Sequence, residues 1–185
     1  MITIQSNRVG TMEISEDRVI TFPEGIVGFT ELKRFIVADD PNDPTMPFKW
    51  LIPLENPDMI FLVTDPGIFF NDYAFDLEEE HKEFIGARTE DDVSVITLLT
   101  VPSDPSKITS NLRAPLVINW RSMVGRQLIL RSTNYQTKHY IFIQRDAVEN
   151  EKVSTASSAL DENTNVLLGG ADALLGKDGG ALTGK

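Results

Sequence analysis

The sequence predicts a mainly β, mostly antiparallel fold, a barrel or a sandwich, with one or two short helices. Short runs rich in Val, Ile, Thr and aromatic residues recur between turn signals, which is typical of such folds. The runs are ITIQS, TMEIS, RVITF, RFIVA, FKWLIPL, MIFLVT, VSVITLLTV, PLVIN, RQLIL and YIFIQ. FPEG at residues 22–25 suits a turn, and Pro41, Pro44 and Pro47 exclude a helix between two of the runs.

Individual elements can be placed from capping signals and periodicity. The predicted helix follows Asp76, which is placed to cap its first turn, with Glu79 at the reciprocal position of a capping box and Gly86 at its end. The uncharged run at residues 93–101 is apolar on both alternating faces, which predicts a central strand. Edge strands are expected near the N-terminus, and Gly125 is expected in a hairpin turn.

The chain of 185 residues has room for one domain and a tail. Composition changes after about residue 150, because residues 151–185 contain no aromatic residue and no proline but hold 6 of the 12 glycines. We therefore predict a β-barrel-like domain at 1–150 and a low-complexity, flexible C-terminal tail at 151–185. Leu167, Leu168, Leu174 and Leu175 could let part of this tail dock on the domain.

The residue types present argue against catalysis. The chain has no Cys, which excludes disulfides, thiol nucleophiles and Cys-ligated metals, and its only imidazoles are His81 and His139. No nucleotide-binding loop or catalytic motif is found, so we expect no catalytic residue, no cofactor and no metal, and hence no enzyme. A signal peptide and a long apolar run are also missing from the sequence, which predicts a soluble, cytoplasmic protein with no membrane partner.

Charge is unevenly distributed along the chain. The net charge is −11, yet residues 105–145 contain seven Lys or Arg and no acid, whereas residues 1–104 contain 21 acids and 7 bases. One interpretation is a nucleic-acid-binding patch that would place Arg113, Arg121, Arg126 and Arg131 on one face. The favoured interpretation is that these bases pair with the acidic half, because the negative field of the whole chain repels phosphate.

Four stretches together resemble a known family, the flagellar assembly factor FliW. They are FPEGIVGF with the following LKRFIV, DPGIFFNDYAFDL, TSNLRAPLVIN, and GRQLILRSTNYQTKH, in order over roughly residues 1–145. The resemblance implies a small, non-enzymatic β-barrel-like protein of the bacterial cytoplasm with two alternative partners. One partner is newly made flagellin, and the other is CsrA, an RNA-binding translational repressor. Family members block CsrA at a site away from its RNA surface, so direct nucleic-acid binding is not expected.

The segment 67–73 is the favoured place for a partner contact, because it sets three aromatic residues beside acids. The alternative is that these aromatics plug the mouth of the barrel and fix the loop. Asn111 and Asn119 carry the family pattern later in the chain, where hydrogen bonding in a turn or across the hairpin is the alternative role. The predicted partner-binding residues are Phe69, Phe70, Asp72, Tyr73, Asp76, Asn111 and Asn119.

Two further function classes stay open beside a protein that binds other proteins. A basic-patch nucleic-acid-binding β-barrel predicts a steep salt dependence of RNA binding. A barrel that holds a small ligand predicts a closed apolar cavity. For flagellin, helix-in-groove binding would need an exposed apolar strip, for which the candidates are Ile52, Met59 and Trp120.

Overall fold

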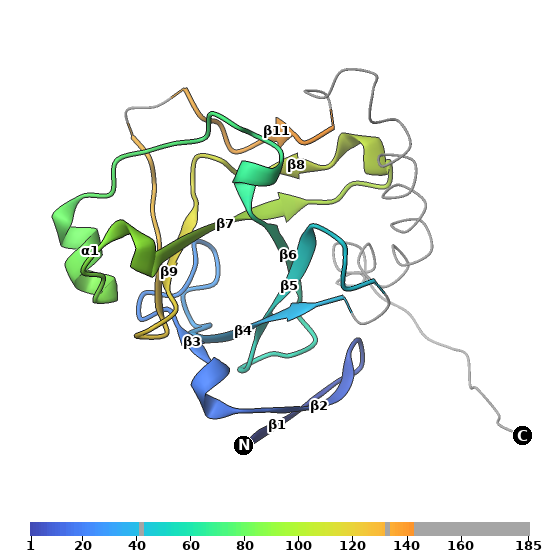
Figure 1. The fold of residues 1–185 in the computed structure, drawn as a ribbon. Helices are drawn as coiled ribbons and strands as arrows, with labels where there is room; N and C mark the ends of the chain where they lie inside the picture. Colours follow the sequence, from blue (N-terminus) through green and yellow to red (C-terminus); the bar gives the residue numbers. More distant parts are fainter. Residues whose placement is uncertain (41–42, 132–133, 143–185) are drawn as a thin grey trace, which may run out of the picture.

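A closed ring of seven strands forms the body of the molecule (Figure 1). This computed structural model describes residues 1–40, 43–131 and 134–142. In spatial order the ring consists of β7 (Val93–Thr100), β6 (Phe61–Thr64), β5 (Phe48–Pro53), β4 (Arg34–Asp39), β3 (Ile20–Thr21), β10 (Val124–Gln127) and β9 (Leu116–Asn119). Neighbouring strands are antiparallel except β3 and β10, and pairing of β9 with β7 closes the ring. The mainly β prediction is confirmed, and the fold is a barrel rather than a sandwich.

Strand β7 is the central strand that the apolar run predicts. It pairs with β6 on one side and, on the other, with β9 and with the short strand β8 (Thr109–Ser110). Ile96 and Leu98 belong to the cluster inside the barrel, whereas Val93 and Val95 pack with the cluster outside it. Because successive side chains of β7 point to opposite faces, this one strand contributes to both hydrophobic clusters.

The barrel interior is a packed core. Each of the main interior side chains is almost completely buried, and they come from the ring strands and the turn after β3: Phe22, Phe35, Leu51, Ile96, Leu116 and Ile118. Aromatic rings meet edge to face there, with 5.3 Å between the ring centroids of Phe22 and Phe35. These side chains fill the space that a small-ligand barrel would leave open.

An N-terminal hairpin covers one part of the outer surface. Its strands β1 (Ile2–Ser6) and β2 (Gly10–Ile14) form a separate two-stranded sheet, seen at the bottom of Figure 1. Ile4 and Ile14 point into a core that includes Trp50 and Leu62 on the outer face of the barrel. The two-faced N-terminal segments are therefore a covering hairpin rather than edge strands of the main sheet.

Helix α1 (Glu79–Ile85) covers another part of the outer surface, where Ile85 packs against Val117. Gly86 ends the helix as predicted, with φ +68°. The predicted capping box is wrong: the N-cap is Glu78, and it makes no capping hydrogen bond through its side chain. Asp76 lies too early because contacts of Tyr73 and Ala74 with distant residues hold the preceding segment out of the helix.

Gly125 lies within β10 and not in the turn of the hairpin. The β9–β10 hairpin is confirmed, but its turn spans residues 120–123. A Cβ at Gly125 would lie only 2.5 Å from the Phe22 ring, so the glycine makes room for the core. The two-residue strand β8 was not predicted, and it pairs with β11 (His139–Tyr140). Of the predicted YIFIQ strand at 140–144, only Tyr140 is in a strand among the described residues.

The remaining elements are four short 3-10 turns: η1 (Glu16–Arg18), η2 (Pro66–Ile68), η3 (Glu90–Asp92) and η4 (Pro105–Lys107). Within the described residues, no helix has the length and apolar character to cross a membrane. The predicted tail at 151–185, with its leucines, lies outside the described residues, as does the end of the predicted domain beyond residue 142.

Candidate protein-interaction site

A cleft of about 470 Å³ lies between the segment that follows β6 and the outer face of β7 and β9. Its larger apolar lining residues are Phe75, Leu77, Val93, Val95 and Val117. Its charged lining residues are Asp65, Asp76 and Lys82. We call it the acid-rimmed cleft.

Local hydrogen bonds shape the outer wall of this cleft. The Asp65 carboxylate caps η2 by accepting a 2.8 Å hydrogen bond from the N–H of Gly67. The N–H of Phe70 donates to the carbonyl of Pro66 at 2.9 Å, and the Phe70 ring then packs into the core with 8% of its surface exposed. The Phe69 ring stacks on Phe48 with 5.8 Å between centroids. Two aromatic residues thus anchor the wall from inside.

A pair of tyrosines anchors the wall at its middle. The Tyr73 hydroxyl donates to the carbonyl of Leu112 at 2.8 Å, and its ring centroid lies 4.7 Å from that of Tyr135. The N–H of Ala74 donates to the Tyr135 hydroxyl at 3.0 Å. Burial, with a smaller effect of Tyr135, raises the pKa of the Tyr73 phenol, which keeps the hydroxyl protonated as a donor.

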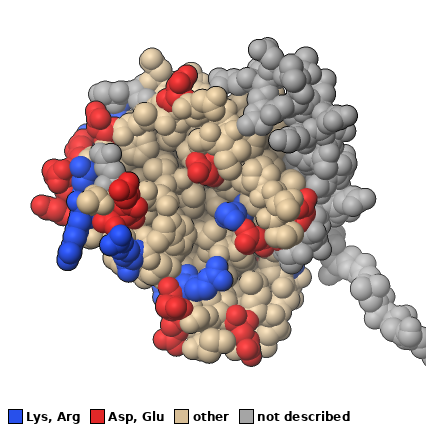
Figure 2. Space-filling model, viewed as in Figure 1, with Lys and Arg blue, Asp and Glu red and all other residues tan. Residues whose placement is uncertain are grey.

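The charge beside the cleft is mainly negative. Lys82 pairs with Glu79 at 2.9 Å, whereas Asp72 and Asp76 are exposed and have no ion-pair partner among the described residues. Charged side chains of both signs gather over the α1 end of the molecule, at the left of Figure 2. An apolar floor beside unpaired carboxylates suits a partner that offers an apolar side chain next to a Lys or Arg.

Three of the basic residues in the later half of the chain form ion pairs with the acidic half, as the favoured interpretation predicts. Arg126 binds Glu24 at 3.0 Å and Glu80 at 3.2 Å, and its guanidinium carbon lies 4.3 Å from the centroid of the Phe84 ring. Arg121 contacts Asp92 at 2.8 Å. Hydrogen bonds, first from the backbone N–H of Arg88, lower the pKa of Asp92, with the Arg121 charge as a smaller cause. The third pair is Lys107 with Asp104 at 3.3 Å. Two of the four arginines that a nucleic-acid-binding patch would use, Arg121 and Arg126, are therefore paired with acids.

The chain was compared with known proteins by sequence and by structure. The model of the FliW protein family matches residues 3–141. This chain belongs to the FliW family. The flagellar assembly factor FliW of Alkaliphilus metalliredigens is 35% identical over 156 residues, which cover 84% of this chain and 96% of that protein. The FliW of Bdellovibrio bacteriovorus is 33% identical over 167 residues, covering 88% and 94%.

A solved structure supports the same assignment. A crystal structure of the flagellar assembly factor FliW matches with a TM-score of 0.71 and 34% sequence identity, covering 78% of this chain and 99% of that one. The resemblance to FliW that the sequence motifs indicate is thus confirmed, together with the barrel fold.

The structure brings only some of the predicted site residues to the acid-rimmed cleft. Tyr73 and Asp76 line it, and Asp72 is exposed in the same segment. Phe69 and Phe70 pack towards the core, so the aromatics do fix the loop, although on the outer face of the barrel and not in its mouth. Whether any of these residues contacts a partner stays a prediction.

Asn111 and Asn119 make structural hydrogen bonds away from the cleft lining. The Asn111 side chain accepts from the N–H of Ala114 at 3.0 Å, which is the turn role considered for it. Asn119 is fully buried; it donates to the carbonyl of Ile85 at 3.1 Å and accepts from the N–H of Arg121 at 2.9 Å. It therefore links the hairpin turn to the end of α1 instead of bonding across the hairpin.

Sequence reasoning missed the apolar floor of the cleft. Val93 and Val95 belong to the run that predicts a central strand, and no feature of the sequence separates these half-buried residues of its outer face from the buried ones. Among the described residues, no group of three or more His, Asp or Glu side chains is placed to hold a metal ion.

Proposed function

We propose that this chain acts in the cytoplasm as a flagellar assembly factor that binds flagellin and antagonises the RNA-binding repressor CsrA. Its membership of the FliW family supports the flagellar role. The proposed action is binding alone, without chemical change of either partner. Both partners would be met inside the cell, where messenger RNA is translated and flagellin is made.

The acid-rimmed cleft is the observation that carries the CsrA part of the proposal. A protein that binds RNA presents basic surface, and a net charge of −11 speeds its encounter with this chain. The exposed carboxylates of Asp72 and Asp76 would meet Lys or Arg side chains, while Val93 and Val95 would receive an apolar one. The ion pairs of Arg121 and Arg126 further support a protein partner over direct RNA binding.

Charge reversal at the cleft tests this proposal. Replacing Asp72→Lys together with Asp76→Lys should slow association with purified CsrA on the order of tenfold at low salt, because steering depends on charges near the contact. Stopped-flow fluorescence or surface plasmon resonance measures the association rate. Both residues are exposed, so the urea midpoint should change little.

A matched control separates local contact from total charge. Replacing Glu13→Lys together with Glu31→Lys changes the net charge equally at exposed positions outside the cleft lining. We expect this variant to associate faster than the cleft variant. Equal association rates for the two variants would place the CsrA contact elsewhere, and direct RNA binding by the wild-type chain would favour the nucleic-acid alternative.

A further inference from the structure

His139 lies against two of the side chains that anchor the outer wall of the acid-rimmed cleft. The centroid of its ring lies 6.0 Å from that of Phe70 and 6.3 Å from that of Tyr135, edge to face in both cases. Phe70 fixes the wall to the core, and the Tyr135 hydroxyl accepts a hydrogen bond from the N–H of Ala74, which lines the cleft. A change of state at His139 therefore acts on two anchors of the wall.

The imidazole of His139 also closes the turn that carries Tyr135. Its Nε2 atom accepts a 2.7 Å hydrogen bond from the backbone N–H of Gln136. The carbonyl of Gln136 accepts from the N–H of Arg113 at 3.1 Å, which fastens the same turn to the segment before β9. Because a backbone N–H can only donate, Nε2 carries no proton, and the imidazole is neutral with its proton on Nδ1. The closed turn thus depends on the protonation state of one side chain.

Protonation of His139 would remove the acceptor from this contact. Both ring nitrogens of an imidazolium are donors, so two N–H groups would face each other where the neutral ring makes a hydrogen bond with Gln136. Burial lowers the pKa of His139 below its ordinary value of 6.5, because the ring lies among apolar groups. The fold therefore favours the neutral ring that closes the turn.

Few charges lie on the segments packed against His139. Its pairing partner in β8 is Ser110, which is uncharged, as is the neighbouring Thr109. The charged or titratable side chains on the segments of Phe70, Gln136 and the Gln136 partner strand are Asp72, Tyr73, Arg113, Tyr135 and Lys138. Asp72, Arg113 and Lys138 are exposed to solvent, and neither tyrosine carries a charge near neutral pH.

We propose that His139 is a pH-sensitive latch on the acid-rimmed cleft: the neutral imidazole holds the wall in place through Tyr135 and Phe70, and its protonation releases the wall and weakens CsrA binding. The binding step rests on the proposed function, whereas release of the wall requires no partner. The inference adds regulation to the cleft, because acidification would return the repressor to its free form.

The pH range of the latch follows from the direction of the shift. Because the pKa of His139 is lower in the closed turn than in an opened one, the latch is fully present above about pH 6.5 and is lost as the pH falls through the lower value. Uptake of one proton limits the loss of affinity to about tenfold for each pH unit. The only other imidazole of the chain is His81, which lies on α1 with Nδ1 2.9 Å from Nη1 of Arg126 and does not line the cleft.

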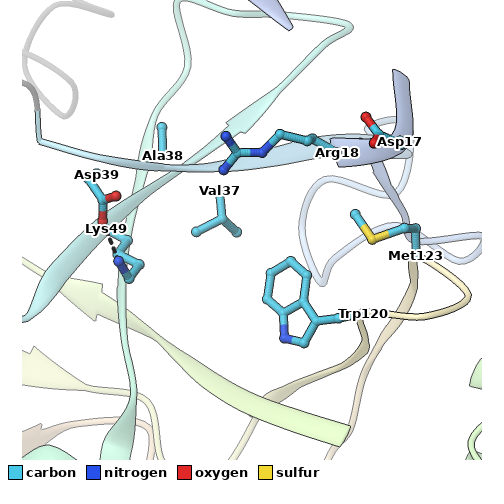
Figure 3. Close-up of a pocket in the computed structure, with 8 residues that line it drawn as sticks. All are labelled: Asp17, Arg18, Val37, Ala38, Asp39, Lys49, Trp120 and Met123. Atoms are coloured by element: carbon cyan, nitrogen blue, oxygen red, sulfur yellow. Dashed lines mark hydrogen bonds and ion pairs between the residues drawn. The ribbon is translucent and has the colours of Figure 1, made fainter. Parts of the chain in front are cut away.

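A second concave surface of the molecule, about 330 Å³ in volume, provides an internal control (Figure 3). It is formed by β4, β5, η1 and the turn after β9, and it shares no lining residue with the acid-rimmed cleft. Among the described residues no imidazole lines it, and its charged lining residues are Asp17, Arg18, Asp39 and Lys49. Trp120 lies there with 42% of its surface exposed. Its signals should therefore not respond to protonation of His139.

NMR of the full, unsubstituted chain tests the latch without a partner. Between about pH 7.5 and 5.5, the amide signals of Gln136 and Ala74 should shift with the same midpoint as the His139 imidazole, and that midpoint should lie below 6.5. The indole N–H signal of Trp120 should stay in place. An Ala74 signal that does not follow His139, or one that shifts equally with Trp120, overturns the inference whether or not CsrA binds.

Binding to purified CsrA tests the consequence at the cleft. Wild-type affinity should fall by about threefold between about pH 7.5 and 5.5. His139→Gln places an oxygen at similar reach that accepts from Gln136 and never gains charge, so its loss should be smaller, while the control His81→Gln should lose affinity like wild type. Titration of CsrA itself is common to all three proteins. Calorimetry gives the affinities, and circular dichroism checks the fold.

The outcomes separate the latch from the proposed function. An equal loss of affinity in wild type and His139→Gln, or a loss that disappears in His81→Gln, overturns the inference and leaves the proposed function standing. If the wild-type chain binds no CsrA at any pH, the CsrA part of the proposed function fails together with the binding step of the inference, and the NMR midpoints still decide whether His139 controls the wall.

Discussion

At the scale of single residues, a close contact between Phe22 and Gly125 helps to close the barrel. Phe22 is fully buried and follows β3, and Gly125 lies in β10, the parallel neighbour of β3. A Cβ at Gly125 would lie 2.5 to 2.9 Å from three atoms of the Phe22 ring. The missing side chain therefore lets a large ring pass between two strands that pair at only one position, Val124 with Thr21.

Replacing Gly125→Ala should destabilise the protein by about 1–3 kcal/mol, because the added methyl group overpacks the core. Urea denaturation of both proteins measures the difference in unfolding free energy. The matched test combines Gly125→Ala with Phe22→Leu, whose smaller side chain makes room. We expect the double variant to be less destabilised than the sum of the two single variants. Simple additivity would show that the ring and the glycine do not constrain each other.

At the scale of elements, Asp58 fastens the N-terminal hairpin to the barrel. Its carboxylate accepts hydrogen bonds from the backbone N–H of Asn7 at 2.7 Å, the side-chain amide of Asn7 at 3.1 Å and the Ser6 hydroxyl at 3.0 Å. These bonds, the Asn7 backbone N–H first, lower the pKa of Asp58 below its ordinary value of 3.8. The tip of the β1–β2 hairpin is thus held by a charged acceptor.

The hairpin attachment should therefore weaken in acid. Because the pKa of Asp58 is lower in the folded than in the unfolded state, its contribution is fully present above about pH 4 and is lost as the pH falls through the folded value. Asp58→Asn should lower the urea midpoint at neutral pH and reduce its further loss in acid. Asp72→Asn is the control, because its carboxylate accepts no hydrogen bond from the described residues. Parallel pH profiles for wild type and Asp58→Asn would contradict the assignment.

Elements with strong local signals were predictable, and those set by distant contacts were not. The apolar run of β7 and the ending of α1 at Gly86 follow from patterns within a few residues. The start of α1 depends on the hydrogen bond from Tyr73 to Leu112, 39 residues away, and capping rules contain no such information. Likewise, a glycine is common in turns, so the sequence favours a turn at Gly125. Its place within β10 is explained only by the close approach of the Phe22 ring, which comes from a distant part of the chain.

At the scale of the whole molecule, the pairing of acids with bases leaves exposed carboxylates beside the acid-rimmed cleft. Three of the later bases form ion pairs with acids of the first half, and among them Arg126 links Glu24 to Glu80. The charge imbalance and the acid-aromatic segment could be recognised from sequence, and the structure places Tyr73 and Asp76 of that segment in the lining of the cleft. The apolar floor of the cleft and the exposure of Trp120 could not, because both depend on which strands of the barrel lie side by side.

Association of CsrA with this chain should depend strongly on salt. Steering of a basic partner by the net charge of −11 acts over distances that ions screen, since the Debye length is about 10 Å at 0.1 M ionic strength. Raising the salt from about 50 to 500 mM should therefore slow CsrA association on the order of tenfold, with a smaller change in dissociation. Surface plasmon resonance at the two salt concentrations measures both rate constants. An association rate that does not change with salt would contradict steering of CsrA by the charge of this chain.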